Sequence, residues 1–241
     1  MYRRLESAEI TGTALALSDR ISARFPGSGL SRVAKELVGV CQDAAQTATW
    51  LARPRKLLRA GVAVGLMVIF VALLGTVLGV RVRMAFTTFS EFVQGLQAGI
   101  QNLVFLGIAV LFLLGLERRW KRRRAVSALH SLRSIAHIID MHQLAKDPET
   151  WGSGESGAEA LAAPDLIRYL DFCSDLLAVI SKAAALHVQD FDDSVSLAAV
   201  NELEDLTAGL SRKIWQKIMI LDRIANFSAS RAGAQTGVGP E

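Results

Sequence analysis

The sequence predicts an all-α protein: a two-helix transmembrane hairpin whose long helices extend into a cytoplasmic helical bundle. Three observations support this prediction. Two uncharged apolar runs lie close together, at residues 60–80 and 99–116. Elsewhere, apolar residues recur at the three- and four-residue spacings of helices. No segment shows the sustained period-two alternation, bounded by turn residues, that is typical of strands.

The composition is more apolar than that of most soluble domains, and the excess lies in those two runs. Hydrophobic residues make up 51% of the 241 and charged residues 21%. The net charge is +4, but the basic residues gather beside the apolar runs, so we expect no nucleic-acid partner. Cys41 and Cys173 lie far apart inside apolar helical patterns, which predicts buried free thiols.

The two apolar runs have the length of membrane-spanning helices. Residues 60–80 would extend about 31 Å as a helix and residues 99–116 about 27 Å, close to the thickness of a bilayer core. A buried core helix is the alternative for either run, but the absence of charged side chains favours the membrane.

The flanking charges predict the orientation of the hairpin. Four basic residues lie between residues 53 and 59, and Arg118–Arg124 follow the second run, whereas the loop 81–98 carries only Arg81 and Arg83. The positive-inside rule therefore places both termini in the cytoplasm of a bacterial cell, beneath its inner membrane. Arg118–Arg124 would contact anionic lipid headgroups, each residue contributing about 1 kcal/mol.

Small residues form a strip along the first predicted span. On a helical projection they occupy an arc of about 80°, which predicts a helix-packing face because small side chains let helices approach closely in lipid. The strip could meet the second span or another subunit. Its members include Gly61, Gly65, Ala72, Gly75 and Gly79.

The residues before the first span, 1–58, are predicted to form N-terminal cytoplasmic helices. A first helix ends at Pro26 and Gly27, and a second begins near Leu30 and runs as far as Pro54. The hairpin occupies residues 59–117. Its outer loop contains a short amphipathic helix, predicted to lie in the membrane interface.

Residues 118–227 are predicted to form the cytoplasmic bundle. A helix continues to about Ala145, a connector rich in glycine and serine covers residues 146–164, and a further helix runs from Asp165 to about Gln189. The sequence DFDDS supplies a turn and an N-cap for the last helix. Residues 228–241 are predicted to be disordered. The last helix carries a heptad packing face that includes Leu203, Leu210, Ile214 and Leu221.

A histidine-rich stretch, HSLRSIAHIIDMHQ, begins at residue 130. On a helix, its histidine and charged residues other than His142 form one stripe over three turns, and most of the apolar residues face the other way. We interpret the stripe mainly as a polar contact between helices or subunits, with Arg133 paired to Asp140 or Asp171. The alternative is an anion site for a lipid phosphate or a nucleotide. The stripe comprises His130, Arg133, His137 and Asp140.

A metal site is a less favoured hypothesis for the same region. His137 and Asp140 have the i, i+3 spacing of helical metal ligands, and His187 and Asp190 repeat it on another helix. Arg133 argues against the site because a guanidinium repels a dication. We therefore predict no metal and no cofactor.

The sequence contains no recognisable catalytic motif, so a non-enzymatic role is predicted. The preferred hypothesis is an inner-membrane scaffold, assembly factor or regulatory subunit that acts by protein–protein association and self-associates. Its protein partner has no signature in the sequence. The alternatives are a membrane-bound metal- or ligand-dependent enzyme or sensor that uses the histidine stripe, and an oligomeric channel.

Overall fold

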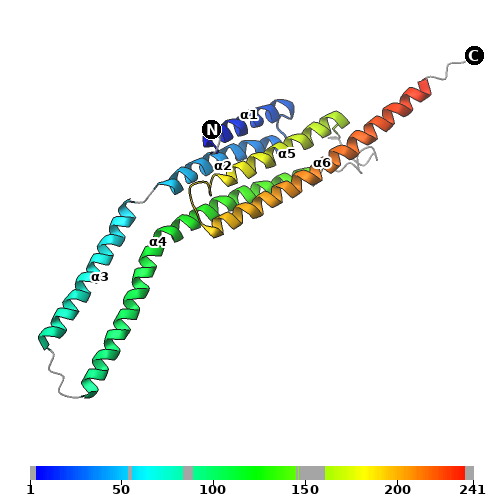
Figure 1. Cartoon of the computed structure of the whole chain (residues 1–241). Coiled ribbons are helices and arrows are strands. Elements are labelled where there is room, and N and C mark those ends of the chain that lie inside the picture. The colour runs from blue at the N-terminus through cyan, green and yellow to red at the C-terminus, as the bar shows by residue number, and fades with distance from the viewer. Residues whose placement is uncertain (1–3, 54–55, 84–88, 145, 147–160, 237–241) are drawn as a thin grey trace, which may run out of the picture. The chain divides into compact units, whose positions relative to one another are not determined.

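The computed structural model describes residues 4–53, 56–83, 89–144, 146 and 161–236. These residues are helical apart from short turns and ends, with no strand among them, as the predicted all-α class requires. Figure 1 shows the helices in chain order. They are α1 (Ser7–Arg24), α2 (Gly29–Ala52), α3 (Lys56–Arg83), α4 (Phe89–Leu144), α5 (Ala163–Ala185) and α6 (Ser194–Thr236).

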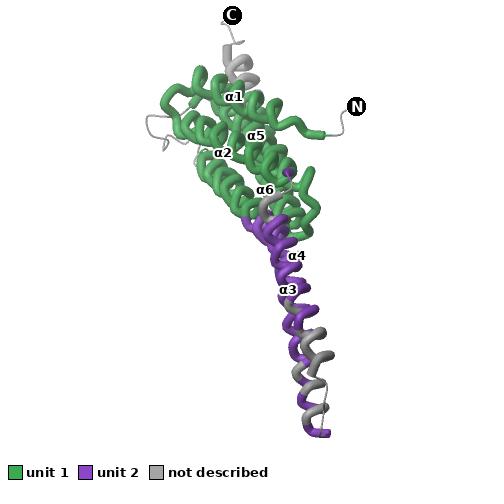
Figure 2. The backbone as a smooth tube through the Cα atoms, turned by 90° about the vertical axis from the view of Figure 1, so that its left-hand side faces the viewer, with its two compact units in different colours: residues 1–52, 124–241 green, residues 53–123 purple. Residues whose placement is uncertain are grey.

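The chain divides into two compact units, coloured separately in Figure 2. Unit 1 contains residues 1–52 and 124–241, and unit 2 contains residues 53–123. Helix α4 therefore contributes its first part to unit 2 and its last turns to unit 1. The helices on either side of the two apolar runs, far apart in sequence, share one unit.

Unit 1 is built around one apolar core to which α1, α2, α4, α5 and α6 all contribute. The predicted apolar faces supply this core. The face of α5 is buried along its whole length, from Leu166 to Ala184, and on α4 Leu132, Ala136 and Ile139 are fully buried. Phe25 after α1 contacts the edges of the Tyr169 and Phe172 rings.

Local signals fix the ends of the helices in unit 1. Helix α1 ends before Pro26, and Gly27 follows with φ of 71°, a left-handed conformation that glycine adopts at little cost. The Ser28 hydroxyl accepts a hydrogen bond from the Ser31 backbone N–H at 3.1 Å and so caps α2. Asp193 caps α6 in the same way, accepting from the Ser196 N–H at 3.1 Å.

Helix α4 is one continuous helix of 56 residues, and it differs from the prediction only in its N-terminal part, where a separate short helix was expected. It joins the amphipathic helix expected in the outer loop, the second predicted span and the helix beyond it. No proline interrupts residues 89–144, and extending an existing helix costs far less than nucleating a new one. The loop predicted at 81–98 is therefore shorter, because α3 continues to Arg83 and α4 begins at Phe89.

Two other predicted segments, the connector 146–164 and the tail 228–241, overlap helices of the structure. Most of the connector 146–164 lies outside the described residues, and α5 begins at Ala163 within it. Helix α6 extends to Thr236, whereas disorder was predicted from residue 228. Alanines at 229, 232 and 234 favour continuation of the helix into this segment.

Unit 2 consists of α3 and the first part of α4. A Cβ atom at Gly65 on α3 would lie 3.4 Å from Cδ1 of Leu113 on α4, so the two helices touch there. The large apolar side chains of unit 2 point outwards. Among those exposed are Val64, Met67, Val68, Phe70, Val71, Leu103, Phe105, Ile108 and Leu111.

One helix among the described residues is long and apolar enough to cross a membrane. It is the segment Gly99–Leu144, whose most apolar window has a mean hydropathy of 2.2 and no buried residue. Ala60–Val71 in α3 is a shorter apolar segment. Most of the first predicted span beyond Val71 lies outside the side chains that the structure describes.

Candidate functional site

Two residues of the histidine stripe of α4, His130 and Arg133, face the beginning of α6. The Arg133 guanidinium forms an ion pair with the Glu202 carboxylate of α6, at 2.7 Å. The sequence had predicted Asp140 or Asp171 as the partner of Arg133. Instead, Asp140 accepts a hydrogen bond from the Gln143 amide at 2.6 Å, and Asp171 pairs with Arg168 on its own helix. The predicted partners were therefore wrong, although Arg133 does link two helices.

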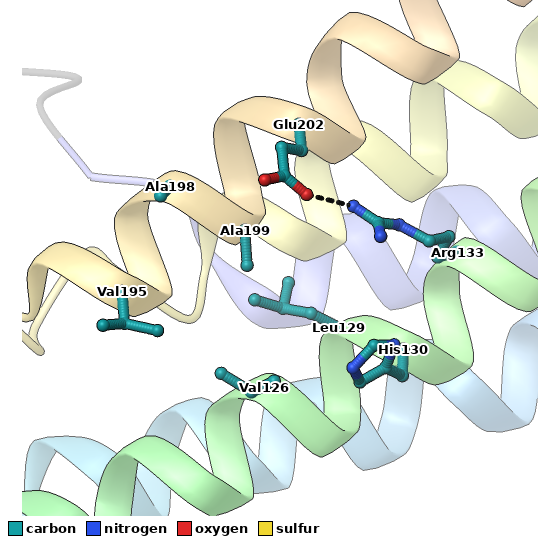
Figure 3. A pocket seen from close by; sticks show the side chains of 8 residues that line it. All are labelled: Val126, Leu129, His130, Arg133, Val195, Ala198, Ala199 and Glu202. Carbon is teal, nitrogen blue, oxygen red and sulfur yellow. Dashed lines mark hydrogen bonds and ion pairs between the residues drawn. The ribbon is translucent and has the colours of Figure 1, made fainter.

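A groove of about 250 Å³ lies beside this ion pair. Figure 3 shows its lining side chains, which come from α4 and from α6. The small side chains Ala198 and Ala199 leave the space open, and Leu129 faces them from α4. His130 lines the groove next to Arg133, whereas His137 and Asp140 do not.

The charges of this groove are nearly balanced. Glu202 neutralises Arg133, so the guanidinium is not available as a lone cation for a phosphate. The His130 imidazole is exposed to solvent. The arrangement therefore fits an apolar contact site with a polar edge better than an anion site.

The four residues of the metal hypothesis do not come together. His187 is fully buried at the end of α5, where its Nδ1 faces the carbonyl oxygens of Ala183 and Ala184 at 3.2 and 3.3 Å. Asp190 pairs with Arg4, and His137 is exposed on α4. Within the described residues, no group of three or more His, Cys, Asp and Glu side chains is placed to hold a metal ion.

His187 is nevertheless an unusual side chain. Its Nδ1 can donate its proton to the backbone carbonyls, which leaves Nε2 as a buried acceptor without a partner. Burial lowers the pKa of His187 below its usual value, and the backbone hydrogen bonds oppose this only in part. The imidazole is therefore neutral at pH 7.

Both cysteines are free and buried, as predicted. Burial raises the pKa of the Cys41 thiol to about 11 and that of Cys173 to about 12. The thiols stay protonated at neutral pH and are therefore poor nucleophiles.

His142 lies apart from the stripe, as its helical position indicated. It packs over Gly29 in the first turn of α2, and a Cβ atom at Gly29 would fall 2.2 Å from its Cε1. Gly29 is thus required for a close approach between α2 and α4, which the sequence analysis did not recognise.

The basic residues beside the apolar runs make specific contacts within each unit. In unit 2, Lys121 is buried, donates a hydrogen bond to the Arg53 carbonyl at 3.1 Å, and pairs with Glu117 at 3.3 Å. In unit 1, the Arg124 guanidinium lies 4.7 Å from the centre of the Trp50 ring. Lys121 thus points into the protein, unlike the headgroup ligand that was expected.

A second hollow, of about 670 Å³, lies between α1 and α5. It is lined by Arg20, Arg24 and Arg168, which the sequence analysis did not single out. Each arginine is paired with an aspartate of α5, so the hollow carries a balanced network of ion pairs. The pairs are Arg20–Asp175, Arg24–Asp165 and Arg168–Asp171.

The predicted helix-packing residues fall into two groups. The heptad residues Leu203, Leu210, Ile214 and Leu221 are buried in the core of unit 1, so this face packs within the chain and is not open to a second copy. In the small-residue strip, Gly65 approaches Leu113, whereas Gly61 and Gly75 border open space. The side chains at Ala72 and Gly79 lie outside those that the structure describes.

Comparison with protein-family models, with curated proteins and with solved structures gives no match to this chain. The site must therefore be interpreted from its own chemistry.

Proposed function

We propose that this chain is a bacterial inner-membrane protein that anchors a cytoplasmic helical bundle and acts by protein–protein association, as a scaffold, assembly factor or regulatory subunit. Unit 2 is the proposed transmembrane hairpin and unit 1 the proposed bundle. Both termini lie in the cytoplasm in this proposal.

One observation carries the membrane part of the proposal. Unit 2 exposes many of its largest apolar side chains, among them Met67 (68% exposed) and Leu111 (71%). Water disfavours such a surface at about 25 cal/mol for each Å² of apolar area, whereas lipid accommodates it. The apolar residues of unit 1 are buried in a core of its own, so unit 1 is suited to water.

The association part rests on the surface chemistry of unit 1. The buried side chains do not support catalysis as an alternative role: the two cysteines are protonated, and His187 contacts backbone carbonyls and not a nucleophile. Large apolar side chains are exposed on α6, including Trp215 (55%) and Met219 (61%). Aromatic and methionine side chains are enriched in protein interfaces.

Reporter fusions test the orientation. Alkaline phosphatase is active only outside the cytoplasm, so we expect activity when it is fused after residue 86 and none when it is fused after residue 241. Green fluorescent protein at the same positions should give the reverse pattern. Phosphatase activity at the carboxy terminus, or a full-length chain that stays soluble without detergent, would overturn the membrane proposal.

A further inference from the structure

The exposed side of α6 in its second half combines basic and large apolar side chains. With Ile214 as the reference, Trp215, Met219, Arg212 and Arg223 project at about 100°, 140°, 160° and 180°, an arc of about 80°. All four are exposed. We call these four residues the α6 outer face.

The opposite side of the same turns packs into the core of unit 1 and so fixes the position of α6. Ile214 and Leu221 are fully buried and Ile218 nearly so, all within the core of unit 1. Lys217 also donates a hydrogen bond from Nζ to the Gln143 carbonyl at the end of α4, at 3.1 Å. The α6 outer face is therefore presented on a fixed helix, which reduces the entropy lost on binding.

The charge along α6 changes sign before this face begins. Residues 190–205 contain six Asp or Glu and no Lys or Arg. Residues 206–236 contain five Lys or Arg and a single acidic residue, Asp222. Of these, Arg212 and Arg223 lie on the α6 outer face, and their charge would attract a negatively charged partner.

We infer that the α6 outer face binds an acidic amphipathic helix of a partner protein. Carboxylates of that helix pair with Arg212 and Arg223, and its apolar stripe covers Trp215 and Met219. Trp and Arg are the residue types that most often dominate binding energies, and both occur here side by side. This inference rests on the proposed role in association and names the surface that would perform it.

A defined peptide tests the inference. The probe is a fluorescein-labelled helix of 21 residues with leucines along one stripe and glutamates elsewhere, and its counterpart replaces every glutamate with lysine. Anisotropy is measured with the full-length chain in phosphatidylcholine nanodiscs. We expect the glutamate peptide to bind at least tenfold more tightly than the lysine peptide.

Paired variants locate the binding. R212E/R223E and, separately, W215A/M219A should each weaken binding of the glutamate peptide at least tenfold. The matched control R32E/K35E makes the same charge change at exposed positions of α2 and should leave binding within twofold. Equal loss in the control, or no loss in the two face variants, overturns the inference.

Two further measurements exclude other occupants. Loss of peptide binding in phosphatidylglycerol nanodiscs would show that lipid covers the face. Dissociation of a dimer by R212E/R223E, measured by light scattering in mild detergent, would show that a second copy covers it. Either result overturns the inference while leaving membrane anchorage, which the reporter fusions measure, intact.

Discussion

The two units use the same apolar residue types in opposite ways. In unit 1, side chains such as Leu132, Leu177 and Ile180 are fully buried among five helices. In unit 2, Phe105 and Leu111 are exposed on α4 although that helix continues into unit 1. The same residue types are therefore buried in one unit and exposed in the other, so the presence of an apolar run in the sequence does not by itself determine whether it is buried in a protein core.

The largest contrast between the units is expected for leucine truncation. Leu177→Ala removes a fully buried side chain and leaves a cavity, so unit 1 should lose about 2–5 kcal/mol of unfolding free energy. Leu111→Ala removes an exposed side chain of unit 2 and should change it by less than about 0.5 kcal/mol. Urea unfolding in detergent, followed by circular dichroism, measures both. Equal losses would contradict the proposed difference.

Introducing charge should reverse that ranking at exposed leucines. Leu111→Arg places a cation in the proposed span, at a cost to insertion of about 2.5–3.5 kcal/mol. Leu144 is also exposed but belongs to unit 1, so Leu144→Arg should be tolerated. The fraction of each variant that resists alkaline extraction from membranes is the measurement. A fully inserted Leu111→Arg chain would argue against lipid around unit 2.

Loss of the α6 cap should affect unit 1 alone. Asp193→Ala removes the acceptor of the Ser196 N–H and hydroxyl, and should cost about 1–2 kcal/mol. Asp192→Ala alters an exposed neighbour and serves as the control. Differential scanning calorimetry should show the transition of unit 1 moving to lower temperature in Asp193→Ala only.

The sequence sufficed for features that depend on nearby residues. The end of the first helix at Pro26 and Gly27, the N-cap within DFDDS and the apolar side of the last helix are each encoded within a few positions, and the structure has a turn at Gly27, a cap from Asp193 and a buried side on α6. Periodicity determines which side of a helix is apolar, whatever the helix later packs against.

Contacts between distant residues could not be predicted in the same way. Arg133 pairs with Glu202, which lies 69 positions later, because the register of α4 against α6 sets the partner. The same holds for His142 over Gly29 and for Lys217 at the end of α4. The sequence also predicted that the helix after the second span continues to about Ala145, and what it did not predict is that the short helix of the outer loop joins that span within α4.

Glycine substitutions sharpen the difference between tight and open packing. Gly29→Ala places a Cβ atom against the His142 ring, which must move, so unit 1 should lose about 1 kcal/mol. Gly39→Ala, in open space within α2, should instead gain about 0.5–1 kcal/mol. If the His142 ring causes this loss, adding His142→Ala to Gly29→Ala should recover the lost stability. Thermal unfolding of these three variants and of the unchanged chain provides the comparison.

The smallest effect is expected from pH, and it too should separate the units. The folded pKa of His187 is lowered by burial, so the unfolded chain binds its proton more readily. The contribution of His187 to the stability of unit 1 should therefore be constant above about pH 7 and fall as the pH drops through the unfolded pKa near 6.5 towards the folded one. His187→Gln should flatten this dependence. The runs 60–80 and 99–116 contain no titratable side chain, so acid should lower the stability of unit 1 while the helices of unit 2 persist. Parallel loss of both units on acidification would mean that the two are one cooperative structure and that lipid does not hold unit 2 independently.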